Sequence, residues 1–155
     1  MHYGKINKYD VANGPGVRVS LFVSGCRNAC KGCFNTQAWD FNFGDKFTDD
    51  TGKEIYEALK PEYITGLTIL GGEPMEPENQ RELMPFIHWI HKHLPDKSIW
   101  LYTGYVYEDL NDLQRKVLEY VDVLIDGPYI QKQRDMTLPF RGSKNQRILY
   151  MKDLR

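Results

Sequence analysis

Val17-Arg18-Val19-Ser20-Leu21-Phe22-Val23-Ser24 is followed directly by Gly25-Cys26-Arg27-Asn28-Ala29-Cys30-Lys31-Gly32-Cys33. The first stretch is rich in β-branched and apolar residues and predicts a buried strand. The second stretch carries every cysteine of the chain and begins a long irregular segment that extends to Asp45. Because a long loop in a compact domain is usually functional, we expect this loop to carry part of the functional site.

Strands and helices are predicted to alternate beyond this loop. Apolar runs predict strands at Leu67–Leu70, Ser98–Tyr102 and Val121–Ile125, with a candidate last strand at Gln146–Met151. Periodicity and capping signals predict helices from Asp49 or Asp50 to about Lys60, from Asn79 to Leu94 and from Glu108 to Tyr120. Such alternation is typical of βαβ units and a mainly parallel sheet. There are too few units for an eight-stranded barrel, so we predict an α/β fold, an open partial (β/α) barrel, in a single domain over residues 1–155.

The composition limits the partners and the location of the chain. The formal net charge is −1, which argues against nucleic acid and against a membrane surface as partners. No apolar run approaches the roughly 18 residues of a membrane-spanning helix. Met1–Asp10 is polar and aromatic, gives no clear secondary-structure prediction and lacks the apolar core of a signal peptide. We therefore expect a cytoplasmic protein.

The cysteines are more informative than the composition. The chain has three, and all of them lie between Cys26 and Cys33. An odd number in a cytosolic chain argues against a disulfide framework and favours metal ligands. A structural zinc site would need a fourth ligand, and the histidines, His2, His88, His91 and His93, are all distant from the loop in sequence. Three thiolates on a four-iron cluster would instead leave one iron open, as a catalytic metal requires.

Polar and glycine-rich segments also follow the other predicted strands. Gly71-Gly72-Glu73-Pro74 follows the second strand, Thr103-Gly104-Tyr105 the third and Asp126-Gly127-Pro128-Tyr129 the fourth. Ligands of open parallel sheets bind at the carboxyl ends of the strands, so we expect one site that includes these segments and the cysteine loop. The alternatives are an ordinary turn at Gly71-Gly72 and a turn-capping role for Asp126.

The C-x₃-C-x₂-C spacing after a first strand resembles the signature of the radical S-adenosylmethionine superfamily. Gly71-Gly72-Glu73-Pro74 is similar to the GGEP element of that superfamily. The resemblance implies a barrel of the radical S-adenosylmethionine type and a 4Fe-4S cluster held by Cys26, Cys30 and Cys33. It also implies that the open iron chelates S-adenosylmethionine and that Gly71–Glu73 receives its amino group. Glycines let backbone carbonyls approach an ammonium group, and a glutamate adds negative charge.

One position departs from the superfamily pattern. Many members carry an aromatic residue just before the third cysteine, whereas this chain has Gly32 there and Phe34 after the cysteine. We expect the backbone of Gly32 and the ring of Phe34 to contact the adenine. Related activases use positions such as Thr103 and Asp126 for ribose or cofactor contacts, so the resemblance assigns both to S-adenosylmethionine binding. No catalytic residue is expected beyond the cluster.

Within the superfamily, the chain is similar to the activating proteins of the anaerobic ribonucleoside-triphosphate reductase over nearly its whole length. The matching stretches are Asn13–Arg18, Leu21–Cys26, Gly32–Asn35, Ile99–Tyr105, Asp126-Gly127 and Arg141-Gly142-Ser143-Lys144-Asn145-Gln146. The resemblance implies that a reduced cluster cleaves S-adenosylmethionine to methionine and a 5′-deoxyadenosyl radical, which takes hydrogen from a glycine Cα of the reductase. The reductase would be the protein substrate, and a one-electron donor such as a reduced flavodoxin-type protein would supply the electron.

Two other functions agree with parts of the sequence. The first is activation of another glycyl-radical enzyme, or radical chemistry on a small molecule, but the element Arg141–Gln146 favours the reductase. The second, from a different class, is a non-catalytic module with a structural zinc ion. The chain from Ile130 to Arg155 is basic, which usually means a solvated surface. The more specific interpretation is that Arg141, Lys144, Asn145 and Gln146 dock the chain onto an acidic patch of its partner.

Overall fold

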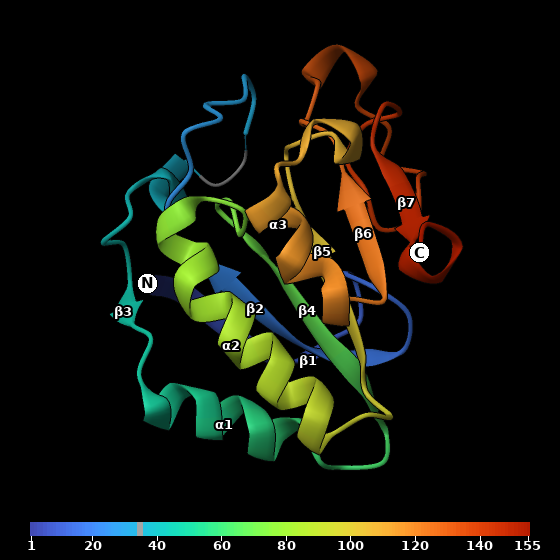
Figure 1. The fold of residues 1–155 in the computed structure, drawn as a ribbon. Helices are drawn as coiled ribbons and strands as arrows, with labels where there is room; N and C mark the ends of the chain where they lie inside the picture. The colour runs from blue at the N-terminus through green and yellow to red at the C-terminus, as the bar shows by residue number, and fades with distance from the viewer. Residues whose placement is uncertain (34–35) are drawn as a thin grey trace.

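The protein is built on one seven-stranded sheet (Figure 1). The structure is a computed structural model, and it describes residues 1–33 and 36–155. The strands are β1 (His2–Asp10), β2 (Val17–Val23), β3 (Asp45–Lys46), β4 (Ile64–Gly71), β5 (Ser98–Tyr102), β6 (Val123–Asp126) and β7 (Arg147–Tyr150). Their order across the sheet is β3-β1-β2-β4-β5-β6-β7, so β3 and β7 form the two edges.

The centre of the sheet is parallel, whereas its outer strands are antiparallel. β2 pairs in parallel with β4, β4 with β5, and β5 with β6. On one side β1 runs antiparallel to both β2 and β3, and on the other side β7 runs antiparallel to β6. Val23 of β2 is in register with Gly71 of β4. The cysteine loop and the turn Gly71–Pro74 therefore begin side by side.

Three α-helices connect the parallel strands. In sequence, α1 (Asp49–Leu59) lies between β2 and β4, α2 (Pro77–His93) between β4 and β5, and α3 (Asp112–Val117) between β5 and β6. Parallel neighbours need such crossovers, whereas antiparallel neighbours do not. All three helices lie on the same face of the sheet (Figure 1). Short 3₁₀ helices occupy Thr36–Trp39, Tyr107–Asp109, Leu118–Tyr120, Gln131–Gln133 and Met151–Asp153.

Local sequence explains where the helices begin. Thr48 and Thr51 form a reciprocal capping box at the start of α1. Pro77 opens α2, where a missing N–H breaks no helical hydrogen bond. Pro85 lies inside α2 without ending it, and burial of neighbours such as Ile87 offsets the lost hydrogen bond.

Within the described part of the chain, no helix is long and apolar enough to cross a membrane.

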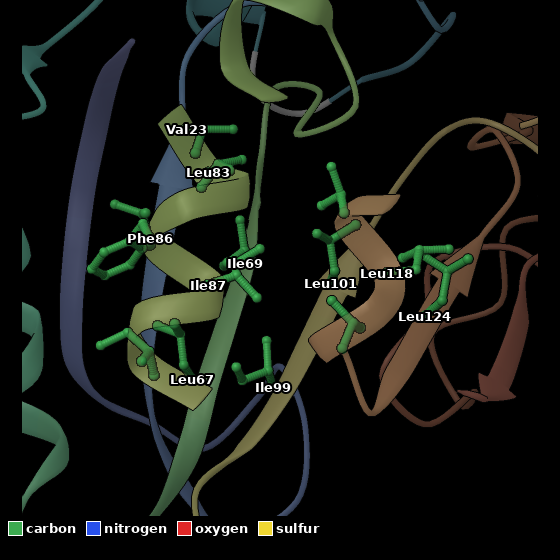
Figure 2. Packing of buried hydrophobic residues seen from close by; sticks show 14 of the residues in the cluster. Val23, Leu67, Ile69, Leu83, Phe86, Ile87, Ile99, Leu101, Leu118 and Leu124 are labelled. Atoms are coloured by element: carbon green, nitrogen blue, oxygen red, sulfur yellow. The ribbon is translucent and has the colours of Figure 1, made fainter. Parts of the chain in front are cut away.

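The main core fills the space between the helices and one face of the sheet (Figure 2). Because side chains alternate along a strand, every second residue of the central strands points toward the helices. Leu67 and Ile69 of β4 meet Ile87 of α2, and Leu118 packs near Leu124 of β6 (Figure 2). This apolar layer fixes the position of the strands whose ends carry the site.

Among the described residues, no α-helix covers the opposite face of the sheet, and a buried cation lies at its centre. Arg18 of β2 is fully buried. Its guanidinium donates to Thr68 Oγ1 (2.8 Å), to Ser98 Oγ (2.9 Å) and to the carbonyl oxygens of Leu67 (3.0 Å) and Ser98 (2.9 Å). Burial lowers the pKa of Arg18 to about 10, so it stays cationic at neutral pH. Arg18 therefore ties β2, β4 and β5 together with charge-assisted hydrogen bonds.

The segment between β6 and β7 covers part of this second face. Phe140 packs edge-to-face on Trp100, with ring centroids 5.3 Å apart. Tyr102, at the end of β5, donates its hydroxyl hydrogen to the carbonyl of Phe140. The tail therefore folds back toward the ends of the parallel strands.

The predicted open partial (β/α) barrel is wrong. Over residues 1–33 and 36–155, the structure is a mixed seven-stranded sheet with three short α-helices on one face, and no helices surround the sheet as they would a barrel. The physical reason lies in the outer strands. β1 and β7 are antiparallel to their neighbours, so they extend the sheet without crossover helices and end the βαβ series on both sides.

Candidate functional site

One pocket brings together the segments that follow the parallel strands. Its volume is about 200 Å³, and it lies beyond the ends of β2, β4, β5 and β6. Its lining among the described residues is Cys26, Asn28, Cys30, Cys33, Trp39, Leu70, Gly71, Gly72, Glu73, Tyr102, Thr103, Gly104, Gly127, Tyr129 and Gln146. The three thiols therefore share a concave site with the glycine-rich turn after β4.

Glu73 links three of these segments through a buried carboxylate. Its Oε1 accepts hydrogen bonds from Asn28 Nδ2 (2.9 Å) and Gly104 N (2.7 Å). Its Oε2 accepts from Met75 N (2.9 Å) and Thr103 Oγ1 (2.7 Å). Burial raises the pKa of this carboxyl, and the four hydrogen bonds oppose that shift. The carboxylate joins the cysteine loop to the turn after β4 and to the end of β5.

A second set of contacts holds the cysteine loop against the start of α2. Arg27 Nη1 lies 2.9 Å from Oε2 of Glu76, a carboxylate that is only 2% exposed, and Arg27 also pairs with Glu78. The guanidinium lies over the ring of Phe41, 4.5 Å from its centroid. Tyr105 donates its hydroxyl hydrogen to Glu76. Exposed ion pairs are individually weak, but here several contacts fix one guanidinium and with it the first half of the loop.

The thiols themselves are free and partly exposed. Burial raises the pKa of the Cys26 thiol to about 11, and the nearby charge of Glu73 acts in the same direction. Within residues 1–33 and 36–155, no three His, Cys, Asp or Glu side chains converge to hold a single metal ion. Each thiolate ligand of a four-iron cluster binds its own iron, so thiols that line one pocket without meeting at a point are compatible with a cluster.

Gly32 has a backbone conformation that favours glycine. Its φ is +79°, and a Cβ at this position would lie 2.9 Å from the side chain of Gln131. An aromatic residue at position 32 would strain the backbone, and the side chain of Gln131 would have to move to make room for it.

A larger cavity of about 560 Å³ lies between α1 and α2, lined by Phe47, Phe86 and Trp89 among other residues. None of the predicted site residues lines it. The smaller pocket is therefore the candidate site, because it contains the chemically distinctive groups.

Known proteins match this chain along most of its length. The family described as a 4Fe-4S single cluster domain matches residues 12–149, which include all three cysteines. A protein of Haemophilus influenzae is 47% identical over 150 residues, which cover 96% of this chain and 97% of the relative. Relatives from Enterobacteria phage T4 (45% over 148 residues, 96% and 93%) and Escherichia coli K12 (36% over 154 residues, 98% and 100%) are similar over the same extent. All three are named anaerobic ribonucleoside-triphosphate reductase-activating protein.

The chain belongs to the family of anaerobic ribonucleoside-triphosphate reductase-activating proteins. In this member of the activating-protein family, most predicted site residues lie in one pocket. The predicted residues that line it are Cys26, Cys30, Cys33, Gly71, Gly72, Glu73, Thr103 and Gln146. Gly32 lies in the cysteine loop without lining the pocket, and Phe34 lies outside the described residues. Which ligand each residue binds stays a prediction.

Asp126 does not line the pocket. Its side chain is 1% exposed and accepts from Arg147 Nε (3.0 Å) and from Tyr107 N (2.8 Å). These bonds fasten β7 to β6 and hold the segment that follows β5. A role of Asp126 in cofactor binding stays a prediction.

The four residues predicted to bind the partner, in the element Arg141–Gln146, form two pairs that differ in their exposure and contacts. Lys144 is exposed and Arg141 is half-buried. By contrast, Asn145 Nδ2 donates to the carbonyl of Pro128 (2.7 Å), and Gln146 Nε2 donates to that of Gly127 (3.1 Å). Asn145 and Gln146 therefore make contacts inside the protein.

Several pocket residues are absent from the sequence-based prediction. Tyr102 directly precedes the predicted segment Thr103–Tyr105, and Tyr129 ends the predicted segment Asp126–Tyr129, but neither tyrosine was assigned to a ligand; assigning every residue at the strand ends would have included both. Asn28 is an amide inside the cysteine loop, and its polarity is the only feature of the sequence that could have placed it in the pocket. Trp39 comes from a 3₁₀ helix, and nothing in its sequence context pointed to the site.

The hydrogen bonds of Glu73 lead to a prediction about stability. Glu73→Gln is expected to lower the free energy of unfolding by about 2–4 kcal/mol, because an amide NH₂ would face two buried donors and leave them unpaired. The measurement is urea unfolding of the cofactor-free protein under anaerobic, reducing conditions. The matched control is Glu62→Gln at an exposed position. A Glu73→Gln protein as stable as this control would show that the four bonds do not hold the site together.

Proposed function

We propose that this chain is an activase that reductively cleaves S-adenosylmethionine at a 4Fe-4S cluster and generates the glycyl radical on the anaerobic ribonucleoside-triphosphate reductase. The observation that carries the proposal is the shared pocket of Cys26, Cys30 and Cys33 with the turn Gly71–Glu73. The family supports the choice of reductase, because the relatives are named for activating it.

The residues proposed to hold the cluster are the three cysteines. They are soft ligands of the kind that iron–sulfur clusters take, and all three line the same pocket as free thiols. The loop that carries them is anchored by Arg27 and Asn28, so their backbone is positioned before any iron binds. Three thiolates for four irons leave one iron available to another ligand.

The turn after β4 is proposed to receive the amino group of S-adenosylmethionine. The carboxylate of Glu73 already accepts four hydrogen bonds, which is its full capacity. Its contribution is therefore negative charge and the positioning of the turn. The backbone of Gly71 and Gly72, which lines the pocket, is left to meet the ammonium group. Thr103 lies beside this turn, because its hydroxyl donates to Glu73 Oε2 (2.7 Å), and it is proposed to complete the binding site with the backbone of Gly32 from the cysteine loop.

The protein residues of the pocket have the tasks of holding the cofactor and excluding water. When bound, the cluster supplies the electron that breaks a sulfur–carbon bond of S-adenosylmethionine. Trp39, Tyr102 and Tyr129 give the pocket aromatic walls. Walls of this kind keep water and stray hydrogen donors away from a reactive carbon radical.

The protein substrate is proposed to be the reductase, which presents a glycine to the pocket. Arg141 and Lys144 are proposed to guide an acidic surface of the reductase, because exposed charge accelerates and orients encounter. A one-electron donor, such as a reduced flavodoxin-type protein, is proposed to reduce the cluster.

The proposal is tested by anaerobic reconstitution with iron and sulfide, followed by reduction with dithionite. We expect a brown protein that converts S-adenosylmethionine to equal amounts of methionine and 5′-deoxyadenosine. Addition of the anaerobic reductase is then expected to give a glycyl-radical signal in electron paramagnetic resonance. The controls omit dithionite or replace iron with zinc. A cluster-loaded protein that leaves S-adenosylmethionine intact would contradict the proposal.

A further inference from the structure

The element Ser143–Gln146 is bonded to the loop that follows β6. Ser143 is fully buried, and its Oγ accepts from Ile130 N (3.2 Å) while donating to Asn145 Oδ1 (2.6 Å). Asn145 Nδ2 in turn donates to the carbonyl of Pro128 (2.7 Å). A chain of hydrogen bonds therefore runs from Ser143 and Asn145 to both sides of Tyr129.

Gln146 extends this series of hydrogen bonds to Gly127, where the same loop begins. Its Nε2 donates to the carbonyl of Gly127 (3.1 Å), and its Oε1 accepts from the backbone N–H groups of Gly142 (2.9 Å) and Ser143 (3.1 Å). One amide side chain thereby links the end of β6 to the start of the element. A half-buried amide that donates to one segment and accepts from another fixes the backbone of both.

The loop that these bonds hold, residues 127–130, forms a wall of the pocket that contains the three cysteines. Gly127 and Tyr129 line the pocket, and so does Gln146 itself. The ring of Tyr129 lies against Gly142, where an added Cβ would be 3.2 Å from the ring. Residues 127–130 therefore sit between the pocket on one side and the Ser143–Gln146 element on the other.

We infer that Ser143, Asn145 and Gln146 are positioning residues for the cofactor pocket, holding residues 127–130 as its wall. The inference rests on the proposed function, since it concerns the same site and its S-adenosylmethionine. It changes the interpretation of the Arg141–Gln146 element, because three of its residues, Ser143, Asn145 and Gln146, act inward on the pocket. Of the four residues predicted to bind the partner, Arg141 and Lys144 are left to face it.

The test compares Gln146→Ala and Asn145→Asp with the wild type. Asn145→Asp keeps the size of the side chain but replaces the donor to Pro128 with an acceptor. The matched control is Gln133→Ala, which removes an exposed glutamine from the same tail. The first measurement is hydrogen–deuterium exchange of the cofactor-free proteins. We expect residues 127–131 to exchange at least about tenfold faster in both variants, while β4 and β5 stay protected.

The second measurement is the affinity of the cluster-loaded proteins for S-adenosylmethionine. We expect the dissociation constant to rise about tenfold in Gln146→Ala and Asn145→Asp, with iron content equal to wild type. The control should match the wild type in both measurements. Faster exchange without weaker binding would show that residues 127–130 are not a wall of the binding site, and unchanged exchange would show that the element does not hold them. Either result overturns the inference. If the cluster-loaded wild type itself bound no S-adenosylmethionine, the proposed function would fail instead.

Discussion

Cys26→Ala, Cys30→Ala and Cys33→Ala are each expected to abolish cleavage of S-adenosylmethionine. Each thiolate binds one iron of the cluster, so the loss of any one leaves two ligands for four irons. The three thiols line one pocket, and the chain has no other cysteine that could replace a missing one. The measurements are iron and sulfide content after anaerobic reconstitution, with about four irons expected for the wild type, and methionine release under dithionite.

Two controls separate the loss of a ligand from a loss of the fold. Lys31→Ala changes an exposed residue of the same loop and should keep both iron and activity. The cofactor-free cysteine variants should also unfold at the wild-type urea concentration, because the thiols are partly exposed and make no core packing. Full activity in any one of the three variants would remove that residue from the cluster. Retention of zinc in place of iron by the wild type would favour a structural metal site.

The central part of the fold was accessible from sequence because its signals are local. The apolar stretch Val17–Ser24 predicted β2, and helical periodicity predicted α2. β1 was not predicted, because its half-exposed residues alternate irregularly and the strand contains register shifts against β2. Whether an outer strand runs parallel or antiparallel depends on pairing between distant segments. That pairing decides between a barrel and a mixed sheet, and no local pattern encodes it.

The candidate site, like the fold, could be predicted from sequence only in part. The spacing of the cysteines and their place after a strand indicated the pocket, because parallel strands bring their ends together. Asp126 was predicted to face the cofactor, yet it pairs with Arg147. The position of Arg147 beside Asp126 follows from the antiparallel pairing of β6 and β7, which the sequence pattern left undetermined. Likewise, the inward bonds of Gln146 depend on how the tail folds back.

Gly72 shows how the structure changes an expectation about the site. From sequence, Gly72→Val is expected to weaken S-adenosylmethionine binding while the cluster content stays normal, because the added side chain would block the close approach of the backbone. In the structure, a Cβ at Gly72 would lie 2.7 Å from the carbonyl oxygen of Gly25 and 2.8 Å from that of Ala38. Both are backbone atoms, and Gly25 directly precedes Cys26. Relief of the clash therefore requires the start of the cysteine loop to move.

Gly72→Ala is accordingly expected to impair both cofactors. The backbone around Gly72 is closely tied, because Gly72 N donates to Val23 O (2.8 Å) and Glu73 N donates to Gly25 O (2.7 Å). Insertion of a methyl group into such packing costs about 1–3 kcal/mol, and here the strain falls on the segment that positions Cys26. We expect iron content after reconstitution to fall well below wild type and affinity for S-adenosylmethionine to drop at least about tenfold.

The matched control for this prediction is Gly52→Ala in α1. The nearest atoms to a Cβ at Gly52 would be in the rings of Phe86 (3.5 Å) and Phe47 (4.0 Å), which are ordinary contacts. Since alanine favours a helix over glycine by about 1 kcal/mol, this variant should be at least as stable as the wild type and keep a full cluster. Iron content and equilibrium binding of S-adenosylmethionine are measured for both variants. If Gly72→Ala bound iron normally and lost only S-adenosylmethionine, the turn would act on the ligand alone, and the mechanical link from Gly72 through Gly25 to Cys26 would be wrong.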